Sequence, residues 1–148
     1  MRRAAVIATV LALAFLDAPL AQPAEPGETG RSVWDGIYTE TQARRGAELY
    51  ASGCARCHGP DLRGGEMAPP ITGGDFRWNW NGVSVGQLFE RLRVTMPLDG
   101  PERMTRDEKA DVLAFMLYIN EYPAGEAELP DRGEVLDQIR FEAIRKQP

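Results

Sequence analysis

The chain has 148 residues, of which 43% are hydrophobic and 26% are charged, and its formal net charge at pH 7 is −5. These values are typical of one globular domain with a single hydrophobic core. The negative net charge argues against nucleic acid as a partner, because binding to phosphates requires a basic face.

The first segment, residues 1–21, has the pattern of a signal peptide. Two arginines precede an apolar run over residues 4–16, which is shorter than the roughly 20 residues that span a bilayer. Because a proline lies near the end of the segment, the position of the cleavage site is left open between residues 18 and 24. An uncleaved membrane anchor stays an alternative. The pattern predicts an exported, periplasmic protein that contacts a membrane only if this segment is kept.

A flexible lead-in is expected next, over residues 22–31, because this stretch is rich in proline and glycine and has no apolar period. The folded domain is expected over residues 32–122. Its first helix begins at Thr39 or Thr41, either of which can cap it, and runs to about Ala51.

The following stretch, from Gly59 to Gly82, is rich in glycine and proline, and no window in it carries a helical period. It is therefore predicted to be a long loop. A loop of this length in a small domain normally wraps around a ligand or has a function of its own.

Two further helices are predicted, each with a capping box at its start. Ser84 begins one that runs to about Thr95, because Pro97 excludes the residue before it from helical geometry. Thr105 begins the other, over residues 106–120, where apolar residues recur on one face. The predicted fold is therefore all-α.

The remaining residues, 123–148, are predicted to be a C-terminal extension that packs on the body of the domain. Its apolar residues are scattered among charged ones. We expect a short helix after Asp131, followed by an extended arm.

Both cysteines and the single histidine lie in one pentapeptide, Cys54-Ala-Arg-Cys57-His58. Cys-x-x-Cys-His is the attachment signature of c-type haem, in which two thiols add to the porphyrin and the histidine reaches the iron from the same side. A disulfide is an alternative, since exported thiols meet oxidising conditions. A redox dithiol or a zinc site is another.

The rest of the chain weighs against those alternatives. A structural zinc site needs about four nitrogen or sulfur ligands, and the chain has no other cysteine or histidine. A thioredoxin-like dithiol would lie in a βαβ setting, for which the sequence has no signal. The sequence therefore favours one covalently attached haem c, held through Cys54 and Cys57 with His58 on the iron and wrapped by the long loop.

The second axial ligand cannot be a histidine, because no second one exists. The candidates are an open position or one of six side chains: Met67, Met96, Met104, Met116, Lys109 and Lys146. Met96 is favoured, because Pro97 holds it in an extended conformation at the end of a helix. Histidine and methionine together keep iron six-coordinate and raise its potential, which predicts a single-electron carrier. An open position would instead predict a haem peroxidase or a gas-binding protein.

Three more residues are expected near the haem. His58 should donate its second ring nitrogen to a backbone carbonyl, with Pro69 and Pro70 as the candidates. An indole N–H of Trp80 or the guanidinium of Arg93 would suit a propionate, although plain aromatic packing explains Trp80 equally well.

With these motifs in place, residues 39–122 resemble the class I c-type cytochromes. The resemblance implies a cytochrome c-like helical fold around one haem, in which the first and last helices cross. Gly46 and Tyr50 would then meet Leu113 and Phe115. It also implies that Pro69 rather than Pro70 accepts from the haem histidine and that Met96 is the second ligand.

Longer stretches, among them DLRGGEMAPP and NWNGVSVGQLFERLRVTMP, resemble more narrowly the small exported monohaem cytochromes c associated with bacterial quinoprotein alcohol dehydrogenases. This resemblance implies a dehydrogenase as electron donor and an oxidase or another cytochrome in the respiratory chain as acceptor. It implies an electron-transfer protein with no catalytic residues. A haem subunit permanently docked to a dehydrogenase, with the C-terminal extension as the docking arm, is the alternative.

Overall fold

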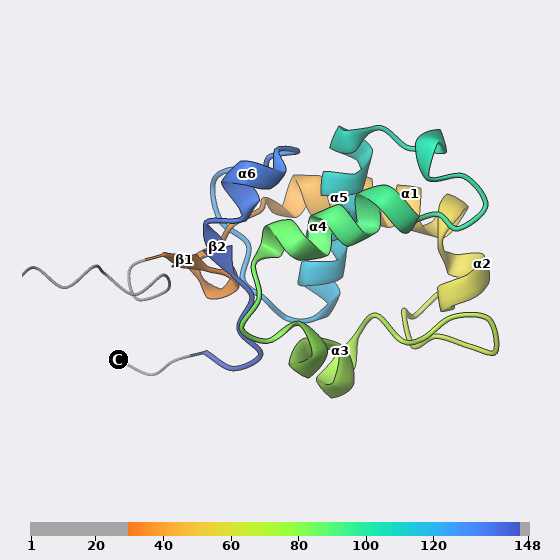
Figure 1. The fold of residues 1–148 in the computed structure, drawn as a ribbon, viewed down its shortest axis with the longest axis horizontal. Helices are drawn as coiled ribbons and strands as arrows, with labels where there is room; N and C mark the ends of the chain where they lie inside the picture. The colour runs from red at the N-terminus through yellow and green to blue at the C-terminus, as the bar shows by residue number, and fades with distance from the viewer. Residues whose placement is uncertain (1–29, 146–148) are drawn as a thin grey trace, which may run out of the picture.

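A computed structural model describes residues 30–145, so the predicted signal peptide and most of the lead-in lie outside the described residues (Figure 1). The elements, in chain order, are β1 (Arg31–Ser32), a 3-10 turn (Val33–Asp35), α1 (Glu40–Gly53), α2 (Ala55–His58), α3 (Gly73–Trp80), α4 (Val85–Thr95), a second 3-10 turn (Pro101–Arg103), α5 (Arg106–Ile119), α6 (Gly133–Leu136) and β2 (Ile139–Arg140). The fold is mostly helical, as predicted. Within residues 30–145 no helix has the length and apolar character needed to cross a membrane.

The three predicted helices are confirmed, and their caps explain where they begin. Thr39 accepts a hydrogen bond from the Gln42 N–H at 3.1 Å and starts α1. Thr105 and Glu108 form the complete capping box at the start of α5, with bonds of 3.2 and 2.8 Å. Each cap satisfies a backbone N–H that has no partner inside the helix.

The helices α1 and α5 cross at the centre of the molecule (Figure 1). At the crossing, Gly46 is so close to α5 that an added Cβ would overlap the carbonyl group of Asp111 and lie 3.0 Å from the Phe115 Cβ. One turn later, the rings of Tyr50 and Phe115 pack with centroids 5.4 Å apart. The expected contact of Gly46 and Tyr50 with Phe115 is therefore present, Gly46 also meets the backbone of Asp111, and the contact with Leu113 stays a prediction.

The third long helix, α4, packs on α5 and α6 through its apolar stripe. Ser84 caps it by accepting from the Gln87 N–H at 3.1 Å, while its hydroxyl donates to Asp137 at 2.7 Å. The helix ends at Met96, whose backbone is extended (φ −126°, ψ 144°). This end matches the prediction from Pro97.

The predicted loop over residues 59–82 contains a helix, α3, so this part of the prediction was wrong. Only Phe76 of this helix is buried, and the segment therefore has no amphipathic period of its own. The ring of Phe76 packs on that of Trp80 one turn later, with centroids 6.5 Å apart. It also packs edge-on against the ring of Phe141 in the C-terminal segment, with centroids 6.0 Å apart. Tertiary contacts of this kind, rather than local propensity, stabilise a short helix.

The chain after α5 returns along the body of the molecule. Gln42 of α1 binds both the N–H and the carbonyl oxygen of Leu129, at 2.7 and 2.9 Å. Further on, β2 pairs in parallel with β1, and the buried ring of Phe141 lies 5.3 Å from that of Tyr122. In Figure 1 these terminal elements and α6 lie at one end of the molecule, and α2 lies at the other.

Candidate haem-binding site

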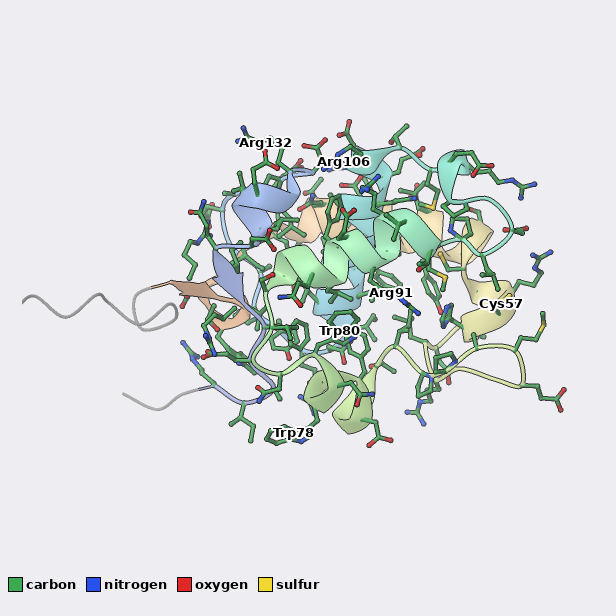
Figure 2. All side chains as sticks on the ribbon, in the orientation of Figure 1. Cys57, Trp78, Trp80, Arg91, Arg106 and Arg132 are labelled. Atoms are coloured by element: carbon green, nitrogen blue, oxygen red, sulfur yellow. The ribbon has the colours of Figure 1, made fainter. Side chains whose placement is uncertain are left out.

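The two cysteines lie at the start and within the single turn of α2, directly after α1 ends. The carbonyl oxygen of Cys54 accepts from the N–H groups of Cys57 and His58, at 3.1 and 3.0 Å, so one tight turn brings the three side chains together. Both thiols are free and half-buried. Burial, and then the neighbouring Cys57, raise the pKa of the Cys54 thiol. Figure 2 shows Cys57 at the α2 end of the molecule.

The imidazole of His58 is buried and oriented by the backbone of the following loop. Its Nδ1 lies 2.9 Å from the carbonyl oxygen of Pro69. Since a carbonyl only accepts, Nδ1 is the donor, which leaves the lone pair of Nε2 free to bind a metal. This is the contact that the sequence led us to expect, with Pro69 rather than Pro70 as the acceptor.

Backbone hydrogen bonds hold the loop that carries Pro69 in place. The N–H of Gly64 donates to the carbonyl oxygen of His58 at 2.8 Å, and the N–H of Ile71 donates to that of Leu62 at 2.9 Å. Gly64 has a φ of +78°, and a Cβ there would lie 2.6 Å from the Pro70 nitrogen. Only glycine fits this position, because it combines a left-handed backbone with close approach of another segment.

A third anchor of the site comes from α1. The buried Tyr50 donates its hydroxyl to the carbonyl oxygen of Gly59 at 2.6 Å. Burial raises the pKa of this phenol to about 12, so it stays a donor at physiological pH. The bond fixes the chain immediately after His58.

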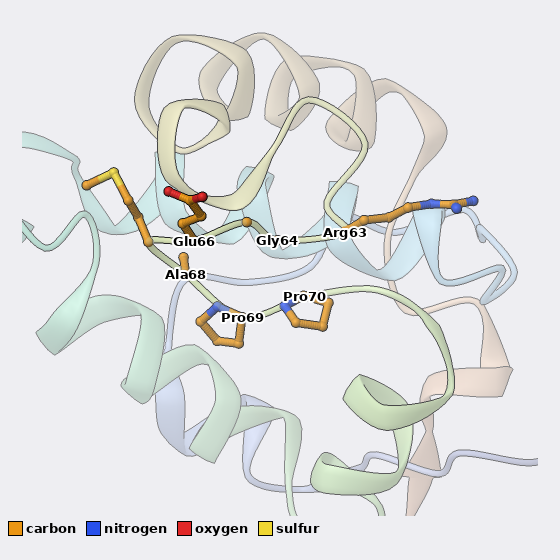
Figure 3. Close-up of a pocket in the computed structure, with 8 residues that line it drawn as sticks. Arg63, Gly64, Glu66, Ala68, Pro69 and Pro70 are labelled. Carbon is orange, nitrogen blue, oxygen red and sulfur yellow. The ribbon is translucent and has the colours of Figure 1, made fainter.

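A hollow of about 540 Å³ is lined by residues 63–70 (Figure 3). In this view Pro69 and Pro70 point to one side of the chain, and Glu66 points to the other. Neither His58 nor Met96 lines the hollow. It is therefore a feature of the loop, and we do not assign it as the haem cleft.

The candidate second ligands differ sharply in their surroundings. Met96 is half-buried against the core at the end of α4. Met67 is 76% exposed, whereas Met116 is buried within α5. Met104 packs partly against the core just before α5. Met96 and Met104 both combine partial burial with an extended backbone. Of the two, Met96 follows a long α-helix, whereas Met104 follows a 3-10 turn.

Lys109 and Lys146 are the two lysine candidates for the second axial ligand. Lys109 is buried, and its Nζ donates to the carbonyl oxygens of Arg93 and Pro101, at 2.7 and 2.5 Å. The Lys109 ammonium is therefore engaged with the backbone. Lys146 lies outside the described residues.

The two predicted propionate partners, Trp80 and Arg93, lie within the described residues 30–145, and within this range neither forms a hydrogen bond with His58. The guanidinium of Arg93 binds Glu90, with Nε and Oε2 at 2.7 Å, which lowers the pKa of that carboxyl. Trp80 is half-buried and packs on Phe76. Sequence reasoning overlooked Arg91, which forms no ion pair with another described residue.

In Figure 2 the Arg91 side chain extends from the side of α4 on which Trp80 is also seen. Arg91 has a side chain that is exposed to solvent. Its backbone carbonyl also accepts from the Thr95 hydroxyl at 2.7 Å, next to Met96.

The donor set fits a c-type haem. Two free thiols are fixed on one turn, an oriented imidazole has its Nε2 available, and a half-buried thioether follows α4. Bound in this way, the haem would have one nitrogen and one sulfur ligand from this chain.

The match to a protein family supports this class. Residues 41–116 match the family model described as cytochrome C oxidase, cbb3-type, subunit III. Among solved structures, the sulfane dehydrogenase SoxCD from Paracoccus pantotrophus is similar, with 20% sequence identity and a TM-score of 0.47, over 83% of this chain and 68% of that chain. No curated protein matches the sequence.

The fold and the site together define a class I c-type cytochrome, a haem-binding protein of electron transfer. Because the family match covers just over half of the 148 residues, the chain belongs to the family described as cytochrome C oxidase, cbb3-type, subunit III.

Proposed function

We propose that the protein is an exported monohaem c-type cytochrome that carries single electrons in the periplasm, from a quinoprotein-type dehydrogenase to the respiratory chain. The observation that carries the proposal is the hydrogen bond from His58 to Pro69, beside two free thiols on the same turn. An imidazole oriented in this way is suited to hold a metal at its other nitrogen.

The roles of the residues follow from their chemistry. Cys54 and Cys57 would hold the haem covalently, and His58 and Met96 would be the axial ligands. Haem supplies an iron that exchanges one electron at a time. Pro69 fixes the tautomer of His58, and Trp80, Arg93 and the newly noted Arg91 are the candidate partners of the propionates.

A carrier is favoured over a peroxidase or gas-binding protein by the position of Met96. Its extended backbone and half-buried side chain suit a residue that occupies the distal position permanently. A spectroscopic test is direct, because an open distal position would bind carbon monoxide rapidly in the reduced wild type. Slow or absent binding is the result that we expect.

The proposal of a dehydrogenase donor is supported by the likeness of the longer sequence stretches to the dehydrogenase-associated cytochromes. It is tested by mixing the ferric protein anaerobically with a purified quinoprotein alcohol dehydrogenase and its alcohol. We expect reduction with a rate proportional to the dehydrogenase concentration. A nicotinamide-dependent alcohol dehydrogenase with the same substrate is the matched control and should not reduce the protein. Equal rates with the two enzymes would contradict a specific donor.

Size-exclusion chromatography of the native protein at high salt separates a shuttling carrier from a permanently docked subunit. A carrier elutes alone, since encounters between redox proteins are weak and small in area. Co-elution with a dehydrogenase at high salt would support the docked subunit instead.

A further inference from the structure

Lys109 is a buried charged side chain that has no part in the proposed binding of haem. It lies in the first turns of α5 and is 2% exposed. Its Nζ donates to the carbonyl oxygen of Arg93 at 2.7 Å and to that of Pro101 at 2.5 Å. These two acceptors lie on either side of Met96 along the chain.

The bond to Arg93 has a specific cause in the sequence. In a helix, a carbonyl oxygen accepts from the N–H four residues later. For Arg93 that residue is Pro97, which has no N–H. Lys109 supplies the missing donor, and its positive charge also suits the negative end of the α4 dipole.

The bond to Pro101 fixes the other end of the same segment. Between the two anchored carbonyls, the chain makes only a short turn, in which the N–H of Gly100 donates to Pro97 at 3.1 Å. Asp99, at the tip, accepts from Arg56, which lies between the two cysteines, at 3.1 Å. This ion pair is largely exposed, so it adds little stability. The buried connection between this segment and α5 is made by the two hydrogen bonds of Lys109.

Burying an ammonium is costly unless its hydrogen bonds are satisfied. Desolvation accordingly lowers the pKa of Lys109, and the nearby Arg93 lowers it further, whereas Glu102 acts in the opposite direction. Two short charge-assisted bonds offset this cost. An apolar side chain could fill the same space without this desolvation cost. The contribution that is specific to the lysine is therefore its two hydrogen bonds to backbone carbonyls.

We propose that Lys109 is a positioning residue for Met96. By fixing the backbone at Arg93 and Pro101, it holds residues 94–101 in one conformation and thereby keeps the Met96 thioether in the distal ligand position. The proposal rests on the proposed role of Met96 as a ligand.

The test compares Lys109→Met with Gln42→Leu in the haem-loaded protein. Gln42 is a matched control, because it is equally buried and also bridges two backbone groups, both of Leu129. Two properties are measured: the sulfur-to-iron absorption band of the ferric form, and the hydrogen exchange of backbone amides in residues 94–103. Lys109→Gln, which keeps a shorter neutral donor, is the second variant if Lys109→Met does not fold.

We expect Lys109→Met to weaken or lose the band and to accelerate exchange in residues 94–103 by roughly tenfold, as the loss of buried hydrogen bonds implies. Gln42→Leu should lower the denaturation midpoint but keep the band. An unchanged band and unchanged exchange in Lys109→Met would overturn the proposal. Equal loss of the band in Gln42→Leu would also overturn it, because the band would then follow global stability.

The failure of the ligand assignment gives a different result. In that case the wild type itself lacks the sulfur-to-iron band, whatever stands at position 109. Faster exchange in Lys109→Met alone would then still support Lys109 as the residue that fixes this segment, while Met96 would lose its role.

Discussion

Gly46 of α1 and Asp111 of α5 touch backbone to backbone, so closely that no side chain fits between them. This approach lets Tyr50, one turn further along α1, reach Phe115 with its ring and Gly59 with its hydroxyl. Gly59 directly follows His58. The crossing of the two long helices is therefore connected to the position of the candidate metal ligand.

The first prediction concerns this crossing. Gly46→Ala should destabilise the protein by about 1–3 kcal/mol, because the added methyl group overlaps backbone that cannot rotate away. Gly53→Ala is the control in the same helix, since a Cβ there meets nothing within 4 Å. It should be neutral or stabilising by up to about 1 kcal/mol, because alanine favours helix over glycine. Urea unfolding of both variants measures the difference, and equal midpoints would contradict the packing described.

The second prediction concerns Asn120, at the end of α5. Its Nδ2 donates to the carbonyl oxygen of Ile71 at 3.1 Å, and its Oδ1 accepts from the Gly73 N–H at 3.1 Å. Asn120→Ala should cost about 1–3 kcal/mol, because it leaves these groups without a partner. Amide exchange should accelerate at residues 71–75, next to Pro69. Asn79→Ala, at an exposed position of α3, should change neither property, and a similar effect of the two substitutions would argue against this anchor.

The third prediction concerns pH. Arg45 binds Asp111 at 2.8 Å and Glu128 at 2.9 Å, which connects α1 to α5 and to the C-terminal segment. The hydrogen bond from Arg45 lowers the pKa of Glu128. A carboxyl whose pKa is lowered by folding stabilises the protein above its ordinary pKa and loses that contribution as the pH falls through the folded value.

Glu128→Gln should therefore cost about 0.2–1 kcal/mol at pH 7, a small amount because the pair is half exposed to solvent. The difference from wild type should vanish in acid, below the lowered pKa of Glu128. Thermal unfolding between pH 7 and pH 3 follows this change, with Glu126→Gln as an exposed control. A difference that grows towards low pH has the wrong sign and would refute the assignment.

Local signals made much of the fold predictable. Thr39, Ser84 and Thr105 each cap a helix that the sequence places within a few residues of its observed bounds. The residues of the Cys-x-x-Cys-His pentapeptide are contiguous, so their meeting on one turn follows from the sequence. A carbonyl acceptor for His58 at Pro69 or Pro70 was expected from the chemistry of a metal-binding histidine, and the choice of Pro69 came from the resemblance to a family.

The remaining features depend on contacts between distant segments. The helix α3 forms because Phe76 packs on Phe141, and the sequence does not show that these two residues meet. The role of Lys109 needs two facts together, a carbonyl of Arg93 left without its donor by Pro97 and the closeness of α5. The first could be read from the sequence, whereas the second requires the structure.

The central claim is that Met96 shares the haem iron with His58, and it is tested most directly by the absorption spectrum of the ferric haem-loaded protein. Wild type, Met67→Ala and Met104→Ala should all show the sulfur-to-iron band, and Met96→Ala should lack it while retaining covalently attached haem. A band that persists in Met96→Ala, or that disappears in Met104→Ala instead, would contradict the account.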